Sequence, residues 1–244
     1  MRLLIILGAL LLAFTSVQAS DLAKEQRWRE QVVGDLFDGE PLDLNDGKTD
    51  FLALLTEPGD SNGKAVIVMH GIGVHPDWPQ IINPLRVQLA EDGWTTLSIQ
   101  LPVLVNDAEE GAYEPLVAEA SPRIDAALAY FQEQGFSDIY LVAHSLGARM
   151  AAYYLANHPT SVSGFVGVGM NVGTVEYMGQ IKLPVLDLYG SEDLGGVLES
   201  AGDRAQQAAN NPNYTQRVVD GADHFFDGME GPLYAEVSGW LEAQ

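Results

Sequence analysis

The sequence predicts an α/β fold with a mostly parallel sheet, helices on both faces and an antiparallel hairpin near its N-terminal end. Short, near-continuous apolar runs recur along the chain, as expected of strands buried on both faces of a parallel sheet. Segments with helical spacing of apolar residues lie between these runs, and a hairpin signal at residues 45–47 precedes them. The length of 244 residues, with 25 Gly and 12 Pro, suits one globular domain with many loops.

Residues 20–40 predict a peripheral helix. Ser20 and Asp21 are suitable N-terminal capping residues, and apolar side chains recur at roughly helical spacing from Leu22 to Leu36. The hairpin follows over residues 41–58, around the turn sequence Asn45-Asp46-Gly47.

The remaining strands and helices alternate. We expect strands at residues 64–71, 94–102, 138–145, 164–171, 184–190 and 215–221. We expect helices at residues 77–93, 121–135, 146–159, 195–210 and 234–244. No repeat or linker interrupts this alternation, so a single domain over residues 20–244 is predicted.

The first 19 residues have the pattern of a secretory signal peptide. Arg2 precedes an uninterrupted apolar run over residues 3–14, and Val17-Gln18-Ala19 provides a small-residue cleavage site. The run is shorter than the roughly 20 apolar residues of a membrane-spanning helix, so an uncleaved anchor is the less favoured alternative. We expect a mature protein that begins at Ser20, lacks a stable membrane span and works in the periplasm or outside the cell.

Composition argues against several classes of partner and cofactor. The formal net charge is −22, which would repel nucleic acid and anionic membrane surfaces. The chain has no cysteine, and therefore no disulfide, thiolate nucleophile or cysteine metal site. It also lacks the common zinc-protease, EF-hand, P-loop and dinucleotide motifs in a suitable context, so no metal or cofactor is expected. None of these patterns sets an oligomeric state.

Two serines compete as a candidate nucleophile. Ser61, in "GDSNGK", fits the pattern G-x-S-x-G better than Ser145 does in "AHSLG". A nucleophilic serine is best placed at a sharp strand-to-helix turn with small neighbours, where the helix N-terminus faces the developing oxyanion. Ser145 has the strand, Gly147 and the helix, whereas Ser61 lies in a polar segment between two strands and is interpreted as part of a turn. Ser145 is therefore the candidate nucleophile.

The strand–serine–helix unit at Ser145, together with "MHGIGVHPDWPQ" at residues 69–80, resembles the α/β-hydrolase superfamily over residues 41–244. The chain is most similar to a group of secreted bacterial α/β-hydrolase-like proteins whose biochemical role is undefined. The resemblance implies a serine hydrolase in which nucleophile, acid and base follow one another in that chain order.

The resemblance places the catalytic base at His224, between the last predicted strand and the terminal helix. His144 projects from another face of the turning backbone, and His158 lies at a helix C-terminus, so both are interpreted as structural. His70 is expected to support a loop and His75 to line the mouth of the site.

The acid is expected after the strand at residues 184–190. Asp193 matches the position that the superfamily uses to orient the imidazole, with Glu192 and Asp187 as alternatives. Asp187 lies inside the strand and would need a partner if it were buried. For the oxyanion, the resemblance implies the backbone N–H groups of Ile72 and Leu146.

These residues predict a secreted or periplasmic serine hydrolase that cleaves a small-molecule or lipid-like carboxylic ester through an acyl-enzyme on Ser145. Thioester and amide substrates stay open. The alternative is a non-catalytic envelope protein that uses the same fold for binding, because fold alone does not separate the two.

The acidic segment at residues 104–121 is expected to form a partial lid at the ligand-binding edge of the sheet. Tyr113, Leu116 and Val117 are expected to line an acyl pocket, while the carboxylates of the segment face water. The segment has no Lys or Arg, which predicts a preference for neutral or cationic esters of short to medium acyl length.

Overall fold

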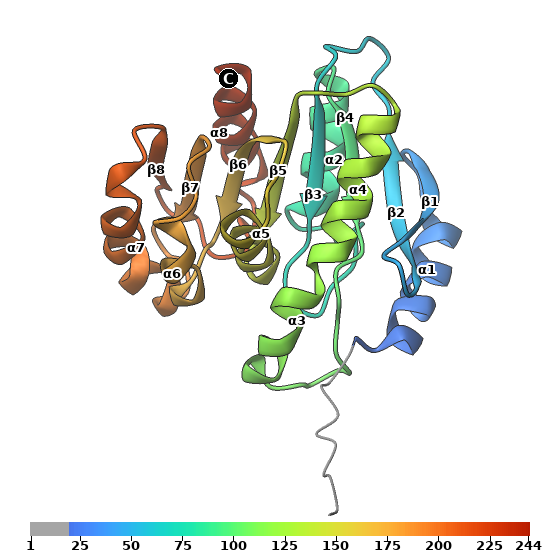
Figure 1. The fold of residues 1–244 in the computed structure, drawn as a ribbon, viewed down its shortest axis with the longest axis horizontal. Coiled ribbons are helices and arrows are strands. Elements are labelled where there is room, and N and C mark those ends of the chain that lie inside the picture. Colours follow the sequence, from blue (N-terminus) through green and yellow to red (C-terminus); the bar gives the residue numbers. More distant parts are fainter. Residues whose placement is uncertain (1–19) are drawn as a thin grey trace, which may run out of the picture.

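The computed structural model describes residues 20–244, which form one mixed sheet with helices on both of its faces (Figure 1). The strands are β1 (Glu40–Asn45), β2 (Asp50–Thr56), β3 (Ala65–Met69), β4 (Thr95–Ile99), β5 (Ile139–His144), β6 (Val162–Val168), β7 (Val185–Gly190) and β8 (Tyr214–Val219). The α-helices are α1 (Leu22–Asp35), α2 (Ile82–Glu91), α3 (Glu114–Glu119), α4 (Ser121–Glu133), α5 (Leu146–Asn157), α6 (Val175–Met178), α7 (Gly195–Gln207) and α8 (Glu230–Glu242).

The strand order is β1-β2-β4-β3-β5-β6-β7-β8, with β1, β2 and β4 joined antiparallel and all later pairs parallel. The predicted hairpin is confirmed: Asn45 pairs with Asp50, and Asp46 accepts hydrogen bonds from the backbone N–H groups of Lys48 and Thr49 at 2.9 and 2.8 Å. The Asp46 side chain thus closes the turn between the two strands.

Alternate residues of each central strand face opposite helical layers. In β3, Ala65, Ile67 and Met69 join the core under α4 and α5, whereas Val66 and Val68 join the core under α2 and α8. Figure 1 shows α4, α5 and α6 in front of the sheet and α2 and α8 behind it. Burial on both faces explains why these strands are apolar throughout.

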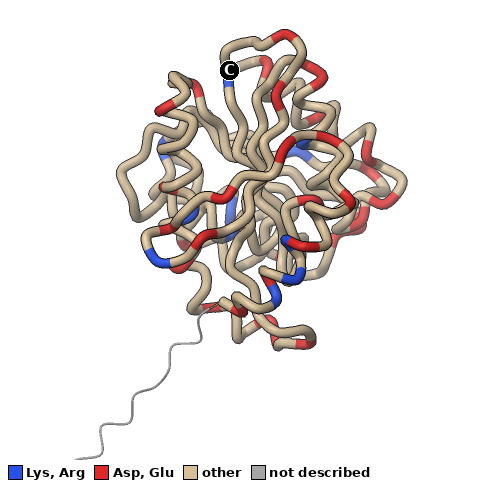
Figure 2. Tube along the Cα trace, turned by 90° about the vertical axis from the view of Figure 1, so that its right-hand side faces the viewer, with Lys and Arg blue, Asp and Glu red and all other residues tan. Residues whose placement is uncertain are grey.

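On the side of the molecule that carries α1 and β1, acidic residues outnumber the basic residues that lie among them (Figure 2). Three arginines, Arg86, Arg123 and Arg204, are nevertheless buried, and each pairs with a carboxylate.

In the described part of the chain, no helix is long and apolar enough to cross a membrane. The predicted signal peptide lies outside the described residues.

The carboxyl ends of the parallel strands meet at one edge of the sheet. The turns and loops that leave this edge carry the segments that the sequence singled out: residues 70–73 after β3, Ser145 after β5, Asp193 after β7 and His224 after β8. Ligands of open α/β sheets bind at this edge.

Candidate active site

Ser145 forms the turn between β5 and α5 in a strained backbone conformation. Its φ and ψ are 54° and −121°, which is unusual for a residue other than glycine. The turn is held by a hydrogen bond of 2.8 Å from the Ser145 N–H to the carbonyl of Val168. A Cβ at Gly147 would lie only 2.3 Å from the carbonyl oxygen of His70, so α5 approaches the loop after β3 as closely as glycine allows.

His224 lies between Ser145 and Asp193. Its Nε2 accepts a hydrogen bond of 3.0 Å from Ser145 Oγ, and its Nδ1–H donates a hydrogen bond of 2.6 Å to Asp193 Oδ1. The Asp193 carboxylate also accepts from the backbone N–H of Leu194 at 2.7 Å, which fixes its orientation. Serine, imidazole and carboxylate therefore form one continuous hydrogen-bonded line.

The structure distinguishes the three candidate acids. Glu192 is exposed, and Asp187 is fully buried in an ion pair of 2.7 Å with Arg204. The hydroxyl of Tyr214 also donates to Asp187 at 2.7 Å. Of the three carboxylates, Asp193 is the one bonded to His224.

Two backbone N–H groups lie beside Ser145 without an acceptor. Within residues 20–244, neither the Ile72 N–H nor the Leu146 N–H donates a hydrogen bond. Leu146 is the first residue of α5, where backbone N–H groups lack intrahelical partners, and Ile72 lies in the turn after β3. A Cβ at Gly71 would lie 3.3 Å from the Cβ of Ser145, so this turn contacts the serine directly.

His144 supports His224 through the backbone, a role that the sequence reasoning missed. Its Nε2–H donates a hydrogen bond of 3.0 Å to the carbonyl oxygen of His224, and the two rings lie 4.8 Å apart between centroids. Burial, together with the neighbouring His224, lowers the pKa of His144 to about 3, so its ring stays neutral. No sequence signal marks this contact because the acceptor is a main-chain atom 80 residues away.

Gly169 packs against the imidazole of His224, and His70 supports the turn after β3. Gly169, with φ of 64°, lies against the ring: a Cβ there would approach His224 Cε1 to 2.9 Å. Gly169 directly follows β6 in the sequence, and no motif there indicates its contact with an imidazole 55 residues later. As expected, His70 supports its loop: it donates to the Gly71 carbonyl at 2.8 Å and accepts from the Leu101 N–H at 2.9 Å.

A cavity of about 470 Å³ opens beside Ser145 and His224. Its apolar walls are formed by Ile72, Val74, Trp78, Leu194, Val197 and Phe225. Its polar lining includes Gln80, Glu110, Arg149 and Asn171. Arg149 is engaged with Glu114 at 2.7 Å and donates to the Gly173 carbonyl at 3.1 Å. The cavity therefore offers mostly apolar surface next to the serine hydroxyl.

Two expectations about the surroundings of the cavity are wrong. Tyr113, Leu116 and Val117 do not line it, because α3 turns these side chains into the main core. The acidic segment contributes Ala108 and Glu110 instead. His75 is likewise not at the mouth: it is buried between the rings of Trp28 and Trp78, at 5.5 and 5.4 Å.

The described residues support neither Ser61 as a nucleophile nor a metal site. Ser61 is exposed in a turn, where its Oγ accepts a hydrogen bond of 3.1 Å from the Gly63 N–H. Among residues 20–244, no group of His, Asp and Glu side chains is arranged to hold a metal ion.

Comparisons with known proteins agree with this architecture. The model of the family described as "Protein of unknown function (DUF3530)" matches residues 22–119 and 107–243. No curated protein sequence matches the chain. Its fold is similar to that of Est1E from Butyrivibrio proteoclasticus with ferulic acid bound, at a TM-score of 0.70 and 16% identity, covering 83% of this chain and 98% of that one.

Two further solved structures are similar. An esterase from Pyrococcus furiosus has a TM-score of 0.71 at 14% identity, covering 85% of this chain and 93% of that one. A dienelactone hydrolase from Anabaena variabilis has a TM-score of 0.69 at 20% identity, covering 84% and 96%. The chain thus has the α/β-hydrolase fold predicted from its sequence.

Proposed function

The chain belongs to the family described as protein of unknown function (DUF3530), and we propose that it is a serine hydrolase that cleaves carboxylic esters through an acyl-enzyme on Ser145. The observation that carries this proposal is the hydrogen-bonded line from Ser145 through His224 to Asp193, with the serine at the wall of the cavity. The similarity of the fold to esterases supports the class of reaction, while the site residues supply the chemistry.

In the acylation step, Ser145 Oγ attacks the ester carbonyl as its proton passes to His224 Nε2. Asp193 holds the imidazole in the tautomer that accepts this proton and stabilises the imidazolium that forms. The N–H groups of Ile72 and Leu146 are the candidate donors to the oxyanion, each worth about 3–4 kcal/mol at the transition state. The proton on His224 then leaves with the alcohol.

In the deacylation step, a water molecule attacks the acyl-enzyme. His224 Nε2 takes a proton from this water, and the collapse of the second oxyanion releases the acid and restores the Ser145 hydroxyl. In this proposal the residues of the chain and one water molecule suffice for both steps.

The cavity favours a neutral ester with an apolar acyl or alcohol part. Its wall carries aromatic and aliphatic side chains, and its basic residue, Arg149, is already engaged with Glu114. Est1E holds ferulic acid in one of its structures, which is compatible with an aromatic carboxylic ester as one substrate class. With the predicted signal peptide at residues 1–19, the proposal places this reaction in the periplasm or outside the cell.

A fluorophosphonate probe tests the proposal, because it forms a covalent bond only with an activated serine. Intact mass should rise by one adduct, and peptide mapping should place the adduct on Ser145. Ser145→Ala should abolish labelling and ester hydrolysis, whereas the matched control Ser61→Ala should leave both unchanged. A folded native protein that neither reacts with the probe nor hydrolyses esters would favour the non-catalytic binding alternative.

A further inference from the structure

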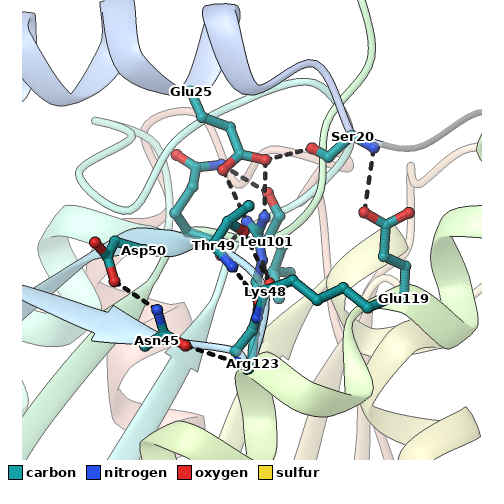
Figure 3. Close-up of polar contacts among 12 residues, drawn as sticks. Ser20, Glu25, Asn45, Lys48, Thr49, Asp50, Leu101, Glu119 and Arg123 are labelled. Carbon is teal, nitrogen blue, oxygen red and sulfur yellow. Dashed lines mark hydrogen bonds and ion pairs between the residues drawn. The ribbon is translucent and has the colours of Figure 1, made fainter.

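Ser20, the residue that follows the predicted cleavage site, is buried and bonded at both its backbone and its side chain. Its exposed fraction is 8%. Its backbone N–H donates to Glu119 Oε1 at 3.2 Å (Figure 3). Its Oγ accepts a hydrogen bond of 2.8 Å from the Val103 N–H. The hydroxyl also contacts the carboxylate of Glu25. A residue at the start of a domain is usually poorly ordered, so these contacts are notable.

The contacts of Ser20 lie in a cluster with more carboxylates than cations. Arg123 is buried and pairs with Glu25 at 3.0 Å and with Asp46 at 3.5 Å. The charged groups in and next to the cluster are Asp21, Lys24, Glu25, Asp46, Glu119 and Arg123. Burial raises the pKa of Glu25, and the neighbouring Glu119 adds to this effect. One more positive charge at this place would reduce the excess of negative charge in the cluster.

We propose that cleavage of the Ala19–Ser20 bond supplies that charge: the new α-ammonium group of Ser20 forms an ion pair with Glu119. Hydrolysis of this bond by a signal peptidase consumes one water and leaves a carboxylate on Ala19 and an amine on Ser20. At neutral pH the amine takes up a proton. The neutral donor already aimed at Glu119 then becomes a cationic donor at the same position, and charge-assisted hydrogen bonds are roughly twice as strong as neutral ones.

The ion pair also fixes the acidic segment beside the cavity. Ser20 bonds to Val103 before this segment and to Glu119 near its end, and the Asp21 N–H donates a further 2.7 Å bond to the Val103 carbonyl. Between these two points lie Ala108 and Glu110, which line the cavity. The processed N-terminus therefore closes a loop whose inner residues face the candidate active site.

The charge of the new amine predicts a pH dependence. An unperturbed α-amino group has a pKa of about 7.7–8.0. Burial, Arg123 and Lys24 would lower the pKa of the Ser20 amine. The carboxylates of the cluster, Asp21, Glu25, Asp46 and Glu119, would raise it, and we expect the direct contact with Glu119 to make the net shift upward. A raised pKa stabilises the fold fully below about pH 8, and this stabilisation is lost as the pH rises through the pKa of the folded state.

The test begins with the precursor expressed in a bacterial host with an export pathway. Intact mass should show a chain that starts at Ser20; processing at any other bond overturns the proposal. The Ser20 chain is then compared with a chain that keeps Ala19 as its first residue, which has the same number of charges but an ammonium group displaced by one residue. Each of these two chains is prepared in three forms: with the native Glu119, with Glu119→Gln, and with Glu109→Gln as an exposed control.

At pH 7, Glu119→Gln should lower Tm by about 2–4 °C in the Ser20 chain and by much less in the Ala19 chain. The Glu109→Gln control should change neither. The ¹⁵N shift of the Ser20 amine should report a pKa above 8 that falls in the Glu119→Gln chain, and the Tm difference should vanish near pH 10.5. Equal Tm losses in both chains, or an amine pKa that Glu119→Gln does not change, would overturn the ion pair. None of these readouts uses esterase activity, so the result is independent of the proposed function.

Discussion

Asp187 lies in β7 and Asp193 in the loop that follows this strand; both are buried, yet they have different partners. Asp187 has an exposed fraction of 0% and pairs with Arg204, while Tyr214 and Gln216 donate to it as well. Asp193 has an exposed fraction of 5% and bonds to His224 and to main-chain N–H groups.

The difference lies in what each partner can do with its remaining atoms. The guanidinium of Arg204 is enclosed: its other bonds go to the Val197 carbonyl and the Ser200 hydroxyl. The imidazole of His224 has a second nitrogen, which reaches Ser145 at the wall of the cavity. The partner of Asp187 is thus saturated, whereas the partner of Asp193 has a second ring nitrogen that faces a cavity, which is why the proposal assigns the catalytic role to Asp193.

The largest expected effect is a loss of activity on substitution of Asp193, which is not expected on substitution of Asp187. Asp193→Asn should lower kcat by about 10⁴-fold, roughly 5 kcal/mol in barrier height, because a neutral amide favours the wrong tautomer of His224. Tm should change little. Steady-state hydrolysis of a neutral ester measures this loss, and a kcat within tenfold of the native value would remove Asp193 from the site.

Substitution of Asp187 should lower the stability of the protein rather than its activity. Asp187→Asn leaves the buried Arg204 without a counter-charge and should lower the free energy of unfolding by about 3–5 kcal/mol. The protein that remains folded should keep kcat within a few fold. Urea denaturation and activity measured on the same sample test both parts. A fully stable but inactive Asp187→Asn protein would reverse the roles given to the two aspartates.

A smaller effect is expected at His144, which positions His224 without touching substrate. His144→Ala should lower kcat by about 10–100-fold, or roughly 1.4–2.7 kcal/mol, with little change in KM. Because the pKa of His144 is lowered to about 3, the pH profile above pH 5 should keep its shape. His158→Ala is the matched control, since His158 stacks on Tyr154 away from the cavity. Equal losses in the two variants would show a general structural effect.

The smallest effect is expected from exposed carboxylates, which act only through a screened field. Glu109, Glu110 and Glu114 are exposed on the acidic segment. At low salt, kcat/KM should be several-fold higher for a neutral ester than for a matched ester that carries a carboxylate, and the difference should shrink at high salt. A preference for the anionic ester at low salt would contradict this expectation.

Much of the architecture follows from local patterns. The strands are recognisable because burial on both faces requires continuous apolar runs, and the strand–turn–helix context separates Ser145 from Ser61. The resemblance to α/β-hydrolases, in which the base follows the last strand, then points to His224. These features depend on short segments, where sequence and structure are closely linked.

The features that cannot be predicted from the sequence depend on contacts between distant segments. The resemblance favours Asp193, but Asp187 stays an alternative at the level of sequence, because the side chain of Arg204 that saturates it lies on another element, α7. The apolar residues of α3 were assigned to the cavity, although their spacing serves a core face equally well. The sequence does not reveal the contact of His144 with His224, because its partner is a backbone carbonyl.

The acyl-enzyme on Ser145 is the central claim, and rapid mixing with a p-nitrophenyl ester tests it most directly. The account predicts a burst of one equivalent of p-nitrophenol per enzyme, followed by slower turnover. Acid quenching during the burst should yield a protein whose mass has increased by one acyl group, mapped to the peptide that contains Ser145. Linear release without a burst from an active protein, with no acyl group on Ser145 at any time, would contradict the account.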